Sequence, residues 1–207
     1  MDIYPTLTDK NLIKARKVLF DVVSFLDNEK INYHLEGGTL LGIVRDKELL
    51  PWDHDVDLSI SVNDAEKFAR KRWKIFLKGY RVTTRRMNQD IGALKKGQYR
   101  IFKVKQFLPS IIKWAFPAAK KFMVVADIFV KASDEQYTYW QAMDKIMRVD
   151  KKYYSHNEII EYYGLKLKAP FEYHNYLTDK FGDWKTPVKN WKCGKDEKTI
   201  IGDAIKI

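Results

Sequence analysis

The chain has 207 residues, a formal net charge of +11 and a hydrophobic share of 45%, which excludes a disordered chain and is enough for one well-cored domain. The positive charge favours an anionic partner, whether a nucleotide, a nucleic acid or a lipid headgroup, and does not choose among them. The single cysteine, Cys193, excludes an intramolecular disulfide bond and a cysteine-rich zinc cluster.

The first elements that the sequence predicts are a helix, a short strand and a second helix. Apolar residues at helical spacing predict a helix with one buried face over residues 8–28. Residues 31–35 alternate in the manner of a strand, residues 36–38 interrupt them, and residues 39–45 indicate a short helix. Residues 56–60 indicate the next strand.

The next predicted helix follows Asn63, which forms a capping-box pattern with Glu66 three residues later. Its apolar residues are expected to face the core: Ala65, Phe68, Ala69, Trp73, Phe76 and Leu77. Its basic residues are expected to face solvent: Lys67, Arg70, Lys71, Lys74 and Lys78.

Further strands are expected in the middle of the chain, at residues 80–85, 99–105, 122–130 and, as an edge strand, 137–141. The remainder indicates aromatic-rich helix and loop, with a polar, lysine-rich tail at residues 189–207. Because helices precede, interrupt and follow the strands, we expect an α+β fold, with a mixed β-sheet and helices packed mainly on one side. We expect a single domain, with its core at about residues 31–187.

Three carboxylates stand at alternate positions near residue 55, namely Asp53, Asp55 and Asp57. In a strand they would share one face, and their repulsion would raise at least one pKa unless a cation lay between them. Hard divalent cations such as Mg²⁺ prefer these oxygen ligands. The alternative is a polar turn before a strand, but Asp55 and Asp57 interleave with Val56 and Leu58 and so belong to the strand itself. The pattern favours a metal-assisted phosphate chemistry site.

Asp127 stands inside the most apolar predicted strand. A carboxylate there is costly unless it is paired or bound to a metal. A salt bridge to a lysine or arginine, or an edge strand facing water, would also explain it. Beside the first cluster, we favour a third metal ligand or a general base, which must lie within hydrogen-bond reach of the attacking hydroxyl.

Gly37-Gly38-Thr39 stands at a strand-to-helix junction, where backbone N–H groups can approach a phosphate. A plain tight turn would explain the same residues, and the spacing fits neither a Walker loop nor a dinucleotide fingerprint. Arg45 could clamp a phosphate or cap the end of the short helix, and Lys47 is ambiguous in the same way.

Residues 107–122 combine aromatic residues and lysines around two prolines, a pattern typical of an interfacial membrane segment. The alternative is a buried hairpin or loop that covers the sheet. No stretch is long and apolar enough to cross a bilayer, and the N-terminus lacks the features of a signal peptide. We therefore expect a cytoplasmic protein, attached peripherally to the inner face of the cell membrane if residues 107–122 contact lipid.

The chain closely resembles the LicD family in two adjacent motifs, Gly38-Thr39-Leu40-Leu41-Gly42-Ile43-Val44-Arg45 and Pro51-Trp52-Asp53-His54-Asp55-Val56-Asp57. That family includes bacterial phosphocholine transferases and the catalytic domains of fukutin and fukutin-related protein. Asp127-Ile128-Phe129 resembles its later aspartate strand, and residues 169–187 resemble its closing motif. The resemblance extends from about Tyr33 to Pro187.

The resemblance implies a nucleotidyltransferase-like fold and a set of site residues. Asp55, Asp57 and Asp127 would be the catalytic metal ligands for Mg²⁺ (or Mn²⁺), with Asp53 beside them. Gly38 and Thr39 would approach the donor phosphates. His54 stands where many members carry an acidic or aromatic residue, and the zinc-binding cysteines of some animal relatives are missing, so no structural zinc is expected.

The implied reaction is transfer of a phospho-alcohol from a CDP-activated donor, such as CDP-choline or CDP-ribitol, to a sugar hydroxyl, with release of CMP. The acceptor would be a cell-surface glycan, free or lipid-linked. Our hypothesis is that the metal bridges the aspartates and the donor diphosphate, Asp127 orients or deprotonates the hydroxyl, and Arg45 and Lys47 assist at the phosphates.

Two other functions fit part of the pattern. A nucleotidyltransferase that attaches the nucleotide itself would use the same carboxylates. A non-catalytic module that binds nucleic acid would use the positive charge, but no aromatic–basic binding motif supports it.

Overall fold

The computed structural model describes residues 6–107, 124–188 and 191–205. Its strands are β1 (Tyr33–Leu35), β2 (Asp55–Ser61), β3 (Tyr80–Arg86), β4 (Tyr99–Gln106), β5 (Val125–Ser133), β6 (Tyr137–Ala142), β7 (Lys145–Asp150), β8 (Asn157–Tyr162), β9 (Leu165–Pro170) and β10 (Ile200–Asp203). In this part of the chain, eight strands form a mixed sheet in the order β1-β2-β5-β6-β7-β10, and β4 joins β3 to β5. β8 and β9 form a separate hairpin. The expected α+β fold is confirmed.

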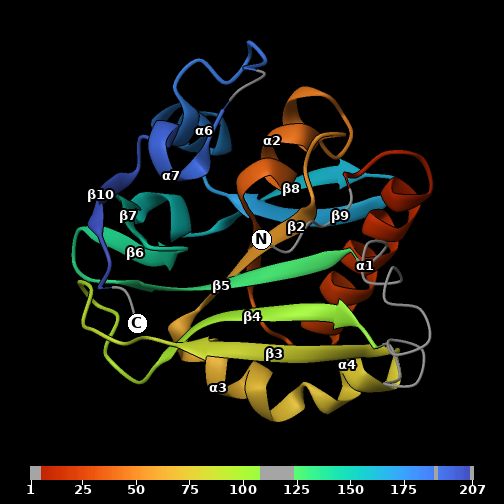
Figure 1. Ribbon diagram of the computed structural model, residues 1–207, viewed down its shortest axis with the longest axis horizontal. Coiled ribbons are helices and arrows are strands. Elements are labelled where there is room, and N and C mark those ends of the chain that lie inside the picture. The colour runs from red at the N-terminus through yellow and green to blue at the C-terminus, as the bar shows by residue number, and fades with distance from the viewer. Residues whose placement is uncertain (1–5, 108–123, 189–190, 206–207) are drawn as a thin grey trace.

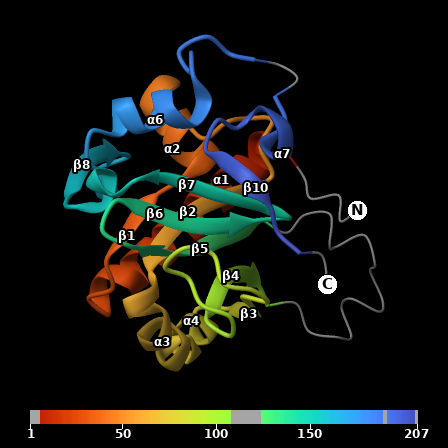
Figure 2. The ribbon, with the colours of Figure 1, turned by 90° about the vertical axis from the view of Figure 1, so that its left-hand side faces the viewer.

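The helices are α1 (Asp9–Asn28), α2 (Gly37–Arg45), α3 (Val62–Lys71), α4 (Trp73–Leu77), α6 (Tyr173–Phe181) and α7 (Cys193–Asp196), with a 3₁₀ turn, η2 (Lys151–Tyr154). Both views show α3 and α4 below β3 and β4, and α6 and α7 towards the opposite side of the molecule (Figures 1 and 2). α1 and α3 contact the central strands β2 and β5.

The central strand β2 separates an apolar face from a polar one. Val56, Leu58 and Ile60 are fully buried in the hydrophobic core, and each such side chain contributes roughly 1.5–3 kcal/mol. Because side chains alternate along a strand, Asp55 and Asp57 point to the other face. The burial that fixes β2 therefore also fixes which face carries the carboxylates.

The polar face continues across the neighbouring strands. β2 and β5 are parallel, and their register places Asp57 opposite Asp127. β4 is antiparallel to β5, and its Lys103 is opposite Asp127. β3 extends the same row with Thr83, which pairs with Lys103. Two residues farther along the same face, β3 carries Arg85, so two acidic strands lie beside two strands that carry basic residues.

The helix predicted after Asn63 differs from the structure in its start and in its buried face. The N-cap is Ser61, whose hydroxyl accepts a hydrogen bond from the Asn63 N–H (3.2 Å). The helix is interrupted at Arg72, which shifts the phase of the apolar positions so that Ile75 is buried instead. Three apolar residues expected in the core are exposed, Trp73 by 55%, Phe76 by 51% and Leu77 by 73%.

The strand predicted at residues 137–141 is not an edge strand. It forms β6, which lies between β5 and β7 because the sheet continues into β7 and β10. β7, β8, β9 and β10 fall where helix and loop were expected, and β10 forms within the predicted polar tail. Most of the segment 107–122 lies outside the described residues. Among the helices that are described, none has the length and apolarity to span a bilayer.

Candidate active site

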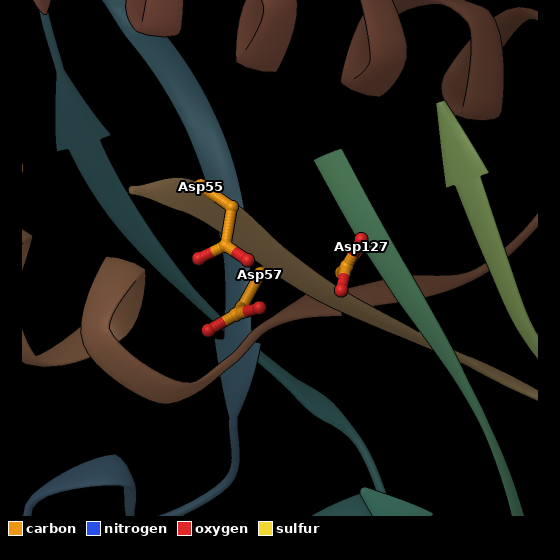
Figure 3. Close-up of side chains that lie close together, drawn as sticks. All are labelled: Asp55, Asp57 and Asp127. Carbon is orange, nitrogen blue, oxygen red and sulfur yellow. The ribbon is translucent and has the colours of Figure 1, made fainter. Parts of the chain in front are cut away.

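Three of the predicted aspartates converge in space. Asp55 and Asp57 project from β2 and Asp127 projects from β5, and their carboxylates lie close together (Figure 3). One oxygen from each of the three lies within 4.8 Å of the others. Two adjoining parallel strands in register are sufficient to produce this cluster, because Asp57 pairs directly with Asp127.

Burial and mutual repulsion disfavour the ionised form of this cluster. Burial raises the pKa of Asp55 to about 8, and the charges of Asp53 and Asp127 add to the effect. Burial also raises the pKa of Asp57 well above its usual value, with Asp55 and Asp53 adding to it. A cation among these oxygens would remove the repulsion, so the electrostatics favour one.

Asp127 offers a free oxygen to such a cation. Its Oδ2 contacts the ammonium of Lys103, whereas its Oδ1 is buried and has no hydrogen-bond partner among the described residues. A buried carboxylate oxygen without a partner is costly. Three carboxylates within reach of one ion, one of them with an unsatisfied oxygen, fit the ligand set that Mg²⁺ and Mn²⁺ prefer.

Asp53 lies beside the cluster rather than in it. It precedes β2, and its Oδ1 accepts a hydrogen bond from the His54 N–H (2.9 Å). It lines the same cavity, and burial raises its pKa. Asp53 therefore adds negative charge beside the three clustered carboxylates and forms part of the cavity wall.

The glycines at the start of α2 allow the helix to approach these carboxylates. A Cβ on Gly37 would lie 2.4 Å from Asp57 Oδ2, and a Cβ on Gly38 would lie 2.0 Å from Asp53 Oδ2. Gly37 also has a φ of +50°, which glycine adopts without steric cost. The N-terminus of α2, which favours anions, is thereby placed against the cluster.

Thr39 holds the backbone of β2 beside the aspartate cluster. Its hydroxyl accepts a hydrogen bond from the Asp57 N–H (2.8 Å), and the side chain is buried. Glu36 N–H donates to the Asp57 carbonyl (3.0 Å). Asp57 is thus fixed on both sides of its Cα, and the structure gives Thr39 a positioning contact rather than an open hydroxyl.

Arg45 and Lys47 are separated by the structure. Arg45 lines the cavity, where its guanidinium pairs with Asp46 (2.8 Å) and donates to the Trp184 carbonyl (3.3 Å). Lys47 donates to the Val44 carbonyl (3.2 Å) at the end of α2 and is absent from the lining of this cavity. The helix-cap interpretation therefore applies to Lys47, and we do not retain it as a donor-binding residue.

The cavity around the cluster has a volume of about 510 Å³. Its basic residues are Arg45, Arg85, Arg100, Lys103 and Lys180, and its aromatic residues include Trp52, Trp140, Trp184 and Trp191. The four basic residues other than Arg45 were not singled out from the sequence. The positions of Arg85 in its predicted strand and of Lys103 in the next could have suggested that both face the same side of the sheet. The pairing register that brings them to the aspartates is not visible in the sequence.

A buried network around Glu36 holds the floor of the cavity. Lys131 Nζ (2.6 Å), Ser59 Oγ (2.9 Å) and Tyr176 OH (2.6 Å) all donate to the Glu36 carboxylate. Burial opposes ionisation of Glu36, but the charges of Lys131 and Lys180 and the hydrogen bonds outweigh it and lower the pKa of Glu36 to about 2. Since Glu36 directly precedes Gly37, this network links β5 and α6 to the turn that carries the glycines.

These motifs are matched by known proteins. The family described as LicD/FKTN/FKRP, nucleotidyltransferase domain, has a sequence model that matches residues 30–172. This chain belongs to the LicD family. The match includes all three clustered aspartates, the glycine turn and Arg45.

Individual relatives of this LicD-family protein match over shorter segments. The lipopolysaccharide cholinephosphotransferase LicD of Haemophilus influenzae is 33% identical over 63 residues, which are 30% of this chain and 23% of that protein. The ribitol 5-phosphate transferase FKRP of Homo sapiens is 49% identical over 43 residues, which are 21% of this chain and 9% of that protein. The matched segments thus cover less than a quarter of either relative.

A solved structure is similar in outline. It is the lincosamide antibiotic adenylyltransferase LnuA with bound lincomycin, with a TM-score of 0.46 and 15% sequence identity over 83% of this chain and 85% of that one.

Proposed function

We propose that this protein is a metal-dependent transferase that moves a phospho-alcohol from a CDP-activated donor to a sugar hydroxyl of a glycan, releasing CMP. One observation carries the proposal: Asp55, Asp57 and Asp127 converge to within 4.8 Å on one wall of a cavity of about 510 Å³. The two named relatives are a cholinephosphotransferase and a ribitol 5-phosphate transferase, which supports this class of reaction.

The three aspartates would hold Mg²⁺ or Mn²⁺, which when bound supplies positive charge against the donor diphosphate. The chain adds its own positive charge in the lining of the same cavity. Arg45 lies in the cavity wall with its guanidinium already oriented by Asp46 and the Trp184 carbonyl. Asp46 and the Trp184 carbonyl take three of the five N–H donors of this guanidinium, and the remaining two would be available to phosphate oxygens with little further loss of side-chain freedom.

Asp127 is the residue that we assign to the acceptor hydroxyl. Its unpartnered Oδ1 has two lone pairs, so it could contact the cation with one and accept a hydrogen bond with the other, while the Lys103 ammonium keeps a positive charge beside its Oδ2. The acceptor hydroxyl would then be oriented for attack on the phosphorus farther from cytidine, and its proton would pass towards Asp127. Positioning and electrostatic stabilisation, rather than covalent catalysis, supply the acceleration in this scheme.

The test is incubation with CDP-choline, CDP-ribitol and CDP-glycerol in the presence of Mg²⁺, with CMP as the measured product. We expect metal-dependent CMP release from one of these donors. Asp55→Ala should reduce the rate by about a thousandfold or more, because it removes a metal ligand. The matched control is Asp64→Ala on α3, outside the cavity lining, which should keep the wild-type rate.

The products also separate the alternatives. An acceptor tagged with the nucleotide would indicate nucleotidyl transfer through the same carboxylates. Salt-sensitive binding of RNA or DNA that survives Asp55→Ala, without turnover of any donor, would indicate a nucleic-acid-binding module. Full CMP release by Asp55→Ala would contradict the assignment of the metal ligands.

A further inference from the structure

Two arginines line the cavity on the side formed by β3 and β4. Arg85 pairs with Ile101, which in turn pairs with Phe129 on β5, so Arg85 shares the face that carries Asp127. The register then shifts, and Arg86 pairs with Tyr99, which leaves Arg100 as an extra residue on β4. A bulge of this kind redirects a side chain. Both Arg85 and Arg100 are among the residues that line the cavity.

Neither arginine has a carboxylate partner in the part of the chain that the structure describes. This distinguishes them from Arg16, which pairs with Glu48, and from Arg45, which pairs with Asp46. Arg100 Nε is buried and lacks a hydrogen-bond partner among the described residues. Burial, followed by the charge of Arg85, lowers the pKa of Arg100. The pair therefore has positive charge and donors that an anion would satisfy.

We propose that Arg85 and Arg100 form a binding subsite for a phosphate group of a substrate in this cavity. The planar guanidinium donates two parallel hydrogen bonds to phosphate oxygens, which explains two arginines here better than a general need for positive charge. The inference rests on the proposed function in that the phosphate belongs to a substrate of the same cavity. It gives β3 and β4, which lie outside the two LicD motifs, a role in substrate binding.

Two sources of the phosphate fit the geometry. β4 lies next to β5 and β3 lies one strand farther, so the two arginines are carried by strands about 5 and 10 Å from the strand of Asp127. One source is the diphosphate of the donor. The other is a phosphate on the acceptor glycan.

Binding of inorganic phosphate, measured by calorimetry with EDTA present and at constant ionic strength, tests the subsite directly. The double variant Arg85→Ala/Arg100→Ala should bind phosphate about tenfold more weakly than the wild type. Arg85→Lys/Arg100→Lys, which keeps the charge but loses the fork, should also be weakened. The matched control is Arg70→Ala, an exposed arginine on α3 outside the cavity lining, which should match the wild type.

Unchanged phosphate affinity in both double variants, with the wild-type melting temperature retained, would overturn the proposal. Phosphate affinity that falls equally in Arg70→Ala would also overturn it, because the loss would then reflect general charge. Should no CDP-alcohol release CMP while the double variants still lose phosphate affinity, the subsite stands and the proposed function fails.

Steady-state kinetics with the active donor distinguish the sources. A KM for the CDP-alcohol that rises in Arg85→Ala, with water as the acceptor, assigns the phosphate to the donor. Loss of transfer that appears only when a phosphorylated sugar, such as glucose 6-phosphate, replaces glucose as the acceptor assigns it to the acceptor. Both outcomes support the subsite and differ in what it holds.

Discussion

Asp57 illustrates how closely single side chains in this site depend on their neighbours. Its N–H donates to Thr39, its carbonyl accepts from Glu36, and its carboxylate faces Asp127 on the next strand. A change of conformation at any of these contacts would move a carboxylate that we propose as a metal ligand. The site is therefore sensitive to substitutions that touch no substrate, of which the adjoining glycines are the clearest case.

Gly38→Ala should reduce CMP release by about tenfold or more, because the new Cβ would lie 2.0 Å from Asp53 Oδ2 and must displace that carboxylate. Steady-state kinetics measure the effect. Gly202→Ala is the matched control, since a Cβ there meets nothing within 4 Å, and it should keep the wild-type rate. Wild-type activity in Gly38→Ala would show that the position of Asp53 has no bearing on catalysis.

Mg²⁺ binding at pH 7 should release about one proton or more, because the pKa of Asp55 is raised to about 8 and that of Asp57 lies well above its usual value. Calorimetry in buffers of different ionisation enthalpy measures the number of protons released. Affinity for Mg²⁺ should rise as the pH rises towards 8. A binding enthalpy that does not depend on the buffer would show that the carboxylates are already ionised.

The sequence was sufficient to predict the clustered aspartates of β2, but it did not predict the basic residues that lie beside them in the site. Asp55 and Asp57 could be predicted because their spacing matches the strand period. Lys103 and Arg85 could not, because they reach the site through the pairing of β3, β4 and β5, which local sequence does not encode. Arg100 depends in addition on a bulge, and Glu36 on contacts with residues more than 90 positions away, such as Lys131.

Among the helices and strands, predictions succeeded where one face alternates clearly with the other. α1 and β2 have a regular buried stripe and were expected near their observed bounds. The buried face of the helix after Asn63 was predicted wrongly in its second half. The helix is interrupted at Arg72, where no Gly or Pro in the sequence indicates a break. The strands β7 and β10 are short, and the residues that pair between them lie far apart in the sequence. Local sequence patterns therefore do not predict them.

Contacts at Glu48 join three separate elements. Glu48 follows α2, pairs with Arg16 on α1 and accepts hydrogen bonds from Tyr162 at the end of β8 and from Tyr163 (2.9 Å). Burial opposes its ionisation, but the hydrogen bonds from Arg16 and Tyr162 outweigh it and lower the pKa of Glu48 to about 2. The folded state therefore favours the ionised carboxylate.

Glu48→Gln should lower the free energy of unfolding by about 2 kcal/mol at pH 7, because the charged hydrogen bonds are lost in a partly buried setting. Denaturant titration measures this difference. The wild type loses the advantage as the pH falls from the unfolded pKa of 4.5 towards 2, so the two proteins should converge in acid. Glu66→Gln, an exposed control on α3, should match the wild type at every pH, and a constant gap between Glu48→Gln and the wild type would contradict the pKa shift.

At the scale of the whole molecule, the proposed cation between β2 and β5 would link the stability of the native state to metal concentration. Mg²⁺ at a hundredfold excess over its dissociation constant should stabilise the native state by about 2.7 kcal/mol, which corresponds to roughly 5–10 °C in melting temperature. Thermal unfolding with and without EDTA measures the shift. At one fixed Mg²⁺ concentration, the gain should be larger at pH 8 than at pH 6, because the raised carboxylate pKa values make the metal-free fold less stable as the pH rises.

An equal melting temperature with Mg²⁺ and with EDTA at both pH values would contradict a metal site in the native state. A shift that persists in Asp57→Asn/Asp127→Asn would place the metal elsewhere on the chain.

Membership of the LicD family narrows the range of reactions to be tested. The segments shared with the named relatives are short, so the donor and the acceptor must be identified by direct assay.

Crystals grown with Mn²⁺ provide the most direct measurement, because the anomalous difference map locates the ion without assumption. We expect one peak or a close pair of peaks in contact with carboxylate oxygens of Asp55, Asp57 and Asp127, at about 2.0–2.2 Å. A fully loaded crystal with no peak at these residues, or with Mn²⁺ bound only at another site, would contradict it.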